Sequence, residues 1–156
     1  MPFVEDATVR TLLKREESYS IHALVNIYEN PGTNAAVIAS HLQIPPAFLA
    51  KVLRKLVKAG FIESRMGRNG GVTLLVDLKQ ISMLDVIEAV SGRLIADNCQ
   101  TREFCATQQR KGHCCIKGAW FRATSAVRTA FSEIILSDLA DEPATPVGPS
   151  VELPVA

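Results

Sequence analysis

A chain of 156 residues with a formal net charge of +1 is long enough for one domain with its own hydrophobic core, and such a domain needs no cross-link to fold. The first ten residues contain two acids and no apolar run, and no later stretch approaches about eighteen uninterrupted apolar residues, so we expect no secretory signal, transit peptide or membrane span. We therefore expect a cytoplasmic protein, in which four cysteines are more typical of metal ligands or redox thiols than of disulfides.

Two amphipathic segments follow an N-terminal extension of residues 1–11. Apolar residues at helical spacing predict a helix over about Leu12–Glu29, which ends at an Asn-Pro-Gly sequence. A shorter second helix follows, with Thr33 or Asn34 as its N-cap. The residues predicted to face inward on this second helix are Val37, Ile38 and Leu42.

The third helix has the clearest pattern in the chain. It begins at Pro45 and Pro46, which are tolerated in a first helical turn, and ends at Gly60 as its C-terminal cap. Its predicted apolar face consists of Phe48, Leu49, Val52, Leu53, Leu56 and Val57. Two short strand-like runs follow at residues 61–65 and 71–76, joined by an Asn-Gly-Gly sequence that supplies the positive φ a hairpin turn requires.

Two more helices are predicted beyond the hairpin. Ser82 and Asp85 have the spacing of a capping box at the start of the fourth helix, which ends at Gly92. After the cysteine segment, a coiled-coil period predicts a long last helix that pairs with a second copy of the chain. The residues of this predicted seam are Ile116, Trp120, Ala123, Val127, Ala130 and Ile134.

This order of elements predicts a mainly α fold with a small β-hairpin wing. We expect residues 1–95 to form a winged helix-turn-helix domain, residues 96–115 a cysteine-rich loop, and residues 116–140 a dimerisation helix. The Pro-rich residues 141–156 have no periodicity and predict a disordered tail. The expected partners are a second copy of the chain and DNA, with no membrane.

Basic residues gather on the third helix and at the hairpin tip. Between positions 51 and 68 there are six basic residues and one acid, Glu63. A basic helix face alone is also typical of a solvated surface, but the attached basic wing favours double-stranded DNA, with the helix in a major groove and the wing in a minor groove. The candidate DNA-binding residues are Lys51, Arg54, Lys55, Lys58, Arg65, Arg68, Asn69 and Gly70.

Several stretches match one known family by motif. The sequence YSIHAL at residues 19–24 is similar to that family's first-helix motif, residues 48–74 to its recognition helix and wing, and residues 81–90 to its fourth helix. With the cysteines before the last helix, they resemble the IscR, NsrR and RirA group of bacterial winged-helix transcription regulators, the Rrf-two superfamily. The resemblance covers roughly residues 12–139 and implies an operator-binding transcriptional repressor, not an enzyme.

The resemblance also implies an iron-sulfur cluster, either 2Fe-2S or 4Fe-4S, held by Cys99, Cys105 and Cys114. Five residues separate Cys99 from Cys105, as is usual in the family. Eight residues separate Cys105 from Cys114, where about five is common, and Cys115 follows directly. A longer loop still closes on a cluster, because the entropic cost of closure grows slowly with loop length.

The residue chemistry of this segment favours the same cofactor. Thiolates are the soft ligands that iron-sulfur clusters require, and basic residues among the thiols favour the thiolate form. Three alternatives remain open: a zinc site, although the spacing is not that of a zinc ribbon; a thiol switch with a disulfide between two of the four cysteines; and a cysteine nucleophile with His113 as its base. The basic residues are Arg102, Arg110, Lys111 and Lys117.

The fourth cluster ligand has four candidates. Cys115 and His113 are in the cysteine segment, whereas Glu17 and His22 are in the first helix. The resemblance suggests that the first-helix ligand comes from the partner subunit. For Glu17 a solvated carboxylate, and for His22 a surface or packing role, are the alternatives.

Two classes of function follow from these patterns. The leading hypothesis is a DNA-binding transcriptional regulator whose operator affinity is controlled by an iron-sulfur cluster that senses iron or cluster supply, nitric oxide or redox state. The alternatives are a cluster-free regulator with a cysteine thiol switch, or a zinc-stabilised winged-helix adaptor that binds protein. The visible absorbance of anaerobically purified protein separates them, since only the cluster is coloured.

Overall fold

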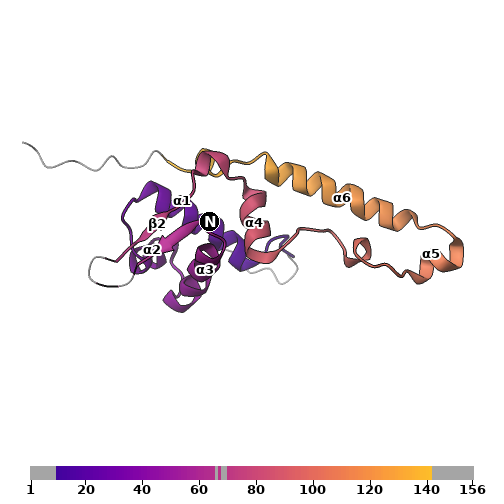
Figure 1. Cartoon of the computed structure of the whole chain (residues 1–156), viewed down its shortest axis with the longest axis horizontal. Helices are drawn as coiled ribbons and strands as arrows, with labels where there is room; N and C mark the ends of the chain where they lie inside the picture. The colour runs from indigo at the N-terminus through magenta and orange to yellow at the C-terminus, as the bar shows by residue number, and fades with distance from the viewer. Residues whose placement is uncertain (1–9, 66, 68–69, 142–156) are drawn as a thin grey trace, which may run out of the picture.

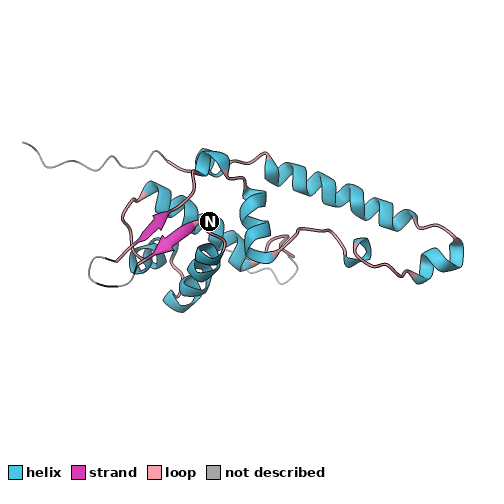
Figure 2. Ribbon diagram, viewed as in Figure 1, coloured by secondary structure: helices cyan, strands magenta, loops and turns pink. Residues whose placement is uncertain are grey.

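The computed structural model describes residues 10–141 except 66, 68 and 69 (Figure 1). Its α-helices are α1 (Arg15–Glu29), α2 (Ala35–Leu42), α3 (Pro46–Lys58), α4 (Met83–Ser91), α5 (Ala106–Lys111) and α6 (Cys115–Ser132). Strands β1 (Ile62–Ser64) and β2 (Val72–Leu74) form an antiparallel hairpin, and η1 (Leu78–Gln80), η2 (Asn98–Gln100) and η3 (Leu136–Leu139) are short 3-10 helices. The predicted mainly α fold with a hairpin wing is confirmed (Figure 2). Arg68, Asn69, the first nine residues and the tail beyond Asp141 lie outside the described residues.

Helices α1 to α4 and the hairpin form a head, and the rest of the chain extends from it as an arm (Figure 1). The chain leaves the head after α4, passes η2, reaches α5 at the distal end and returns along α6. Of the 18 residues of α6, only Thr124 is buried in the described part of the chain. Ile116 and Phe121 are exposed and Trp120 and Val127 half-buried, so much of the apolar surface of α6 is uncovered in the single chain, whereas Phe131 packs against the core.

The hydrophobic core lies inside the head, where α1, α3, α4 and the hairpin meet. Its largest fully buried aliphatic side chains come from all of these elements and from α2, η1 and η3: Leu24, Ile38, Leu49, Leu56, Ile62, Leu78, Ile87 and Leu136. Burial of each such side chain stabilises the fold by about 1.5–3 kcal/mol. Because Leu136 follows α6 in sequence, the returning end of the arm is anchored in the core of the head.

Side-chain caps define the helix starts that the sequence predicts. Asn34 is the N-cap of α2, since its Oδ1 accepts a hydrogen bond from the Val37 N–H at 3.1 Å. The predicted capping box of α4 is confirmed: the Asp85 N–H donates to Ser82 Oγ at 3.2 Å, and the Ser82 N–H donates to Asp85 Oδ2 at 2.8 Å. These bonds satisfy amide groups that a helix leaves unpaired at its first turn.

The hairpin is tied to the turn between α1 and α2. Ile62 pairs with Leu74 and Ser64 with Val72, and the Val72 N–H donates to the carbonyl of Thr33 at 2.9 Å. A Cβ on Gly71 would lie 3.1 Å from that carbonyl oxygen, so the close approach favours glycine there. At the hairpin tip Gly67 has a positive φ of 112° and Gly71 does not, while Asn69 of the predicted Asn-Gly-Gly turn lies outside the described residues.

Two valines predicted to face the core are instead exposed. Val37 is 38% exposed and Val57 is 44% exposed, so their assignment to the inward faces of α2 and α3 is wrong. Both lie at the edge of the apolar stripe of their helix. A stripe predicts which way a helix faces but not how far its neighbours extend to cover it.

Helix ends differ from the sequence prediction in the arm. The last helix ends at Ser132 instead of continuing to residue 140. Beyond it the backbone is extended, and the Met83 N–H donates to the Ile134 carbonyl at 2.8 Å while the Leu136 N–H donates to the Ile81 carbonyl at 2.9 Å.

None of the helices in the described residues has, by itself, the length and apolar composition of a membrane span. The pair α2 and α3, bent by 115° at their turn, has that length and composition when the two are taken together.

Candidate DNA interface and cysteine site

The four basic residues of α3 share one face of the helix. Lys51, Arg54, Lys55 and Lys58 line a shallow depression of about 340 Å³, and we call these four residues the basic face. The opposite side of α3 carries Leu49, Val52 and Leu56, which are buried. The amphipathic division predicted for this helix therefore brings the four candidate DNA-binding residues together.

Glu16 of α1 contacts two members of the basic face. Lys51 Nζ lies 2.5 Å from Glu16 Oε1, and Lys55 Nζ pairs with Glu16 Oε2. Hydrogen bonds from Lys51 and Lys55 lower the pKa of Glu16 from its ordinary value of 4.5 to about 2. The charges of Lys51 and Lys55 are thus partly neutralised within the chain. Arg54 has no such ion pair with the described residues, and its side chain donates to the Ala50 carbonyl of its own helix at 3.3 Å.

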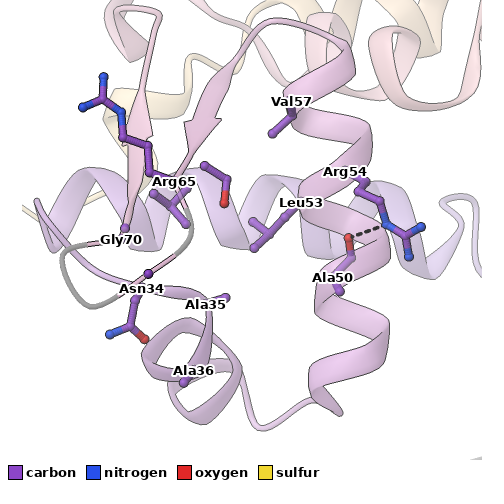
Figure 3. A pocket seen from close by; sticks show the side chains of 13 residues that line it. Asn34, Ala35, Ala36, Ala50, Leu53, Arg54, Val57, Arg65 and Gly70 are labelled. Carbon is purple, nitrogen blue, oxygen red and sulfur yellow. Dashed lines mark hydrogen bonds between the residues drawn. The ribbon is translucent and has the colours of Figure 1, made fainter.

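A wider groove of about 670 Å³ lies between α2, α3 and the hairpin (Figure 3). Its lining is mostly small or apolar, with Ala35 and Ala36 from α2 and Ala50, Leu53 and Val57 from α3. Arg54 and Arg65 lie on opposite sides of it (Figure 3). A concave, mainly apolar surface with arginines at its sides has the chemistry of a DNA groove contact, because arginines bind phosphates or guanines and methyl groups contact thymine.

The wing contributes Arg65 and Gly70 to this groove. Arg65 forms an exposed ion pair with Glu63 of β1, with 3.2 Å between Nη2 and Oε2. Gly70 lines the groove as part of the hairpin tip. The two other predicted wing residues, Arg68 and Asn69, are outside the described part of the chain.

The cysteines are at the distal part of the arm. Cys99 is in η2, Cys105 precedes α5, and Cys114 precedes α6, so each stands at or beside the start of a helical element. These three thiols are half-buried, whereas Cys115 is exposed. The three cysteines predicted as ligands therefore differ from Cys115 in solvent exposure.

Three of the thiols are close enough to influence one another's ionisation. Burial raises the pKa of Cys99, and nearby Cys105 and Cys114 raise it further. The pKa of Cys105 is lowered, chiefly by the backbone N–H of Gln108 and also by Thr107 and the Cys114 thiol. In the described residues, no group of three or more His, Cys, Asp or Glu side chains is spaced to hold a single metal ion. A cluster contains several irons, so its ligands stand further apart than those of one ion.

The candidate fourth ligands are in different surroundings. His113 is exposed beside Cys114, whereas Glu17 is 5% exposed and accepts a hydrogen bond from the Lys14 N–H at 2.8 Å as a helix-capping residue. His22 is exposed on α1. Because α1 belongs to the head and α5 lies at the far end of the arm (Figure 1), neither first-helix residue is near the cysteines of its own chain.

Sequence reasoning missed the contacts that join the arm to the head. Arg128 of α6 pairs with Glu88 of α4 and so joins the arm to the head, and within the arm the Ala96 N–H donates to Thr124 Oγ1 at 2.8 Å. It also missed Glu16. Helical periodicity finds the apolar side of a helix but does not pair polar side chains 28 to 40 residues apart.

A helix-turn-helix followed by a hairpin, with basic residues on the second helix of the motif and on the hairpin, defines the class of winged-helix DNA-binding proteins. The chain belongs to the Rrf2 family: residues 13–142 match its model, which is described as an iron-dependent transcriptional regulator. The protein is therefore a DNA-binding transcriptional regulator of this family and not an enzyme. The family resemblance inferred from the motifs is confirmed.

Known relatives and structures agree with this assignment. The chain is 28% identical over 127 residues to a putative HTH-type transcriptional regulator, YffB, of Lactococcus lactis, with 80% of this chain and 81% of that protein covered. Its fold is similar to that of CymR, the global cysteine regulator of B. subtilis, with a TM-score of 0.64, 20% identity and coverage of 84% and 97%. It is also similar to IscR of T. potens, with a TM-score of 0.63, 20% identity and coverage of 85% and 87%.

Proposed function

We propose that this regulator is a homodimer that binds an operator through the basic face and the wing, and that an iron-sulfur cluster on Cys99, Cys105 and Cys114 controls its affinity. The observation that carries the proposal is the grouping of these three half-buried thiols on an arm whose other end is bonded to the DNA-binding head. The family description as iron-dependent supports it.

The donor set suits such a cluster. Thiolates are its usual ligands, and the lowered pKa of Cys105 makes its thiolate form more accessible than that of an ordinary cysteine. Lys117 is beside the site, since its Nζ donates to the Arg102 carbonyl at 3.3 Å, and its charge lowers the pKa of Cys99 against the stronger effect of burial. When bound, the cluster would supply a cross-link between the three thiolates that is sensitive to iron, nitric oxide and redox state.

The arm connects this site to the reading head. Its proximal end is bonded to the head by Arg128 with Glu88, and by the backbone pairing of Ile134 and Leu136 with the segment before α4. A change in the direction of α6 would therefore move α4 and the head together. In a dimer this motion alters the spacing of the two α3 helices, which is a rigid-body mode of switching.

The proposed dimer seam is the uncovered side of α6. Ile116 is 56% exposed, and Ala123 and Ala130 of the same predicted seam are also exposed. Trp120 and Val127 are half-buried. These residues recur at the period that two paired helices require, so a second copy of α6 is the surface that fits them.

The test is made on protein purified without oxygen. We expect a brown protein with visible absorbance and with iron and sulfide bound. A binding site is first selected from a pool of random duplexes, and its affinity is then compared for cluster-loaded and cluster-free protein. Equal affinities for both forms would overturn control by the cluster, and a colourless protein after anaerobic reconstitution would overturn the cluster itself.

A thiol switch is the second candidate function. Peroxide would oxidise one of the two thiols to a sulfenic acid, and attack by the thiolate of the other would form a disulfide and release water. The lowered pKa of Cys105 and its hydrogen bond with Cys114 favour this step. The fold also resembles that of Staphylococcus aureus CymR, which has been solved in an oxidized form. A colourless protein whose DNA affinity changes with peroxide and recovers with dithiothreitol would support this alternative. The zinc-stabilised adaptor has less support, because the described thiols are not spaced around a single ion.

A further inference from the structure

Two of the four cations of the basic face are held by a carboxylate of their own chain. Glu16 contacts Lys51 at 2.5 Å and also Lys55, which are one helical turn apart on α3. Helix capping does not explain this carboxylate, since Glu17 provides the capping side chain of α1. The hydrogen bond from Ser20 Oγ, at 2.6 Å, is to the backbone carbonyl of Glu16 and leaves its side chain free for the lysines.

A carboxylate in this place resembles a DNA phosphate in charge and in hydrogen bonding. Both are anions whose oxygens accept hydrogen bonds from lysine ammonium groups. Lys51 is 58% exposed, so a phosphate can reach it from solvent, but that phosphate would approach the Glu16 carboxylate as well. Like charges within a few ångströms repel, and the contact with the lysines is weakened accordingly.

We propose that Glu16 competes with DNA phosphates for Lys51 and Lys55 and thereby lowers the sequence-independent part of the protein's affinity for DNA. The inference rests on the proposed role of the basic face. Non-specific affinity comes almost entirely from phosphate contacts, whereas operator binding adds contacts to bases. A residue that weakens two phosphate contacts therefore lowers the affinity for operator and non-specific DNA alike, and a random-sequence duplex is enough to detect it.

The experiment uses the full chain and a random-sequence duplex of about 30 base pairs, with affinity measured by fluorescence anisotropy over a series of salt concentrations. One additional phosphate contact steepens the plot of log affinity against log salt by about 0.9 and is worth roughly eightfold in affinity at about 0.1 M salt relative to 1 M. We expect Glu16→Gln to show at least this gain. Glu29→Gln removes the same charge from the other end of α1 and should leave the salt slope unchanged.

A variant cycle links the gain to the two lysines. In a Lys51→Gln, Lys55→Gln background, adding Glu16→Gln should produce no further gain, because the competed cations are absent. Equal or weaker binding by Glu16→Gln, or the same gain from Glu29→Gln, overturns the inference. If the double lysine variant and Arg54→Ala each bind DNA as the wild type does, both the proposed DNA interface and the role of Glu16 are refuted. If they bind weakly while Glu16→Gln gains nothing, only the role of Glu16 is refuted.

Discussion

Arg128 of α6 forms a two-point ion pair with Glu88 of α4, in which Nη1 contacts Oε1 and Nη2 lies 3.2 Å from Oε2. Arg128 Nη1 also donates to the Leu94 carbonyl at 3.4 Å, and Glu88 Oε1 accepts from the Leu94 N–H at 2.8 Å. Burial raises the pKa of Glu88, but hydrogen bonds from Arg128 and the Leu94 N–H outweigh it and lower the pKa overall. This cluster fixes the point where the chain leaves the head for the arm.

Replacing Arg128 with alanine should destabilise that junction. The substitution leaves a half-buried Glu88 carboxylate without its cation, and a pair intermediate between exposed and buried is worth about 1–2 kcal/mol. The free energy of unfolding, measured in urea, should fall by that amount. Arg122→Ala is the matched control, because Arg122 is exposed on the same helix. A loss of the same size in both variants would contradict the role of the pair.

The Glu16 ion pairs predict a specific acid response. The pKa of Glu16 is about 2 in the folded chain, below its ordinary value of 4.5, so ionised Glu16 contributes stability above about pH 4.5. That contribution is lost as the pH falls toward 2. The difference in free energy of unfolding between wild type and Glu16→Gln should therefore shrink between about pH 5 and pH 2. A difference that stays constant over this interval would show that the carboxylate is not paired in solution.

Elements of the fold that depend on residues close together in the sequence could be predicted, and elements that depend on residues far apart in the sequence could not. Helix α3 could be predicted because its apolar period, its prolines and Gly60 are all local signals. The end of α6 could not, because the coiled-coil period continues to Ile134 while the pairing of that residue with Met83 depends on a segment 51 residues earlier in the chain. The exposure of Val57 likewise depends on how far the hairpin reaches over α3.

The candidate site divides in the same way. The four residues of the basic face belong to one helix, so their helical spacing alone predicts that they lie on the same side. Cys99, Cys105 and Cys114 are spread over three elements, and their grouping depends on α5 and on the reversal of the chain at Gly112, where φ is 74°. The sequence indicated a loop in that region, and its short helix was not predicted.

The uncovered side of α6 predicts that the proposed dimer depends on small and apolar residues there. Ala123→Asp would place two like charges opposite each other across a twofold axis, at a cost of several kcal/mol. Sedimentation at micromolar concentration should show a monomer. Thr129→Asp adds the same charge at an exposed position off the predicted seam and should remain dimeric. A dimeric Ala123→Asp would mean that the chains associate through another surface.

Arg54 lies where the basic face meets the groove between α2, α3 and the wing, so its removal should weaken DNA binding. We expect Arg54→Ala to cost about 1–3 kcal/mol on a selected operator if the guanidinium contacts a base. If it contacts a phosphate, binding weakens equally on all sequences and the salt slope falls by about 1. Lys79→Ala removes an exposed cation from η1 and serves as the control. Unchanged affinity and slope for Arg54→Ala would remove Arg54 from the interface.

The cysteine series tests the arm as a sensor. Because Cys99, Cys105 and Cys114 are half-buried and influence one another's pKa, a serine at any of them should abolish the visible absorbance and the bound iron of the anaerobic protein. Cys115→Ser is the matched control, since the Cys115 thiol is exposed and Cys115 is the first residue of α6, next to Cys114. It should keep the colour unless Cys115 supplies the fourth ligand.

Each of the three ligand variants should also bind the operator as the cluster-free protein does. Allosteric coupling of about 1–3 kcal/mol corresponds to a change of roughly 5- to 150-fold in operator affinity between the loaded and cluster-free forms. Arg128→Ala should reduce this ratio while leaving the absorbance intact, because it loosens the junction that carries motion of α6 to the head without touching a thiol. A full ratio in Arg128→Ala would mean that the signal reaches α3 by a path other than the arm.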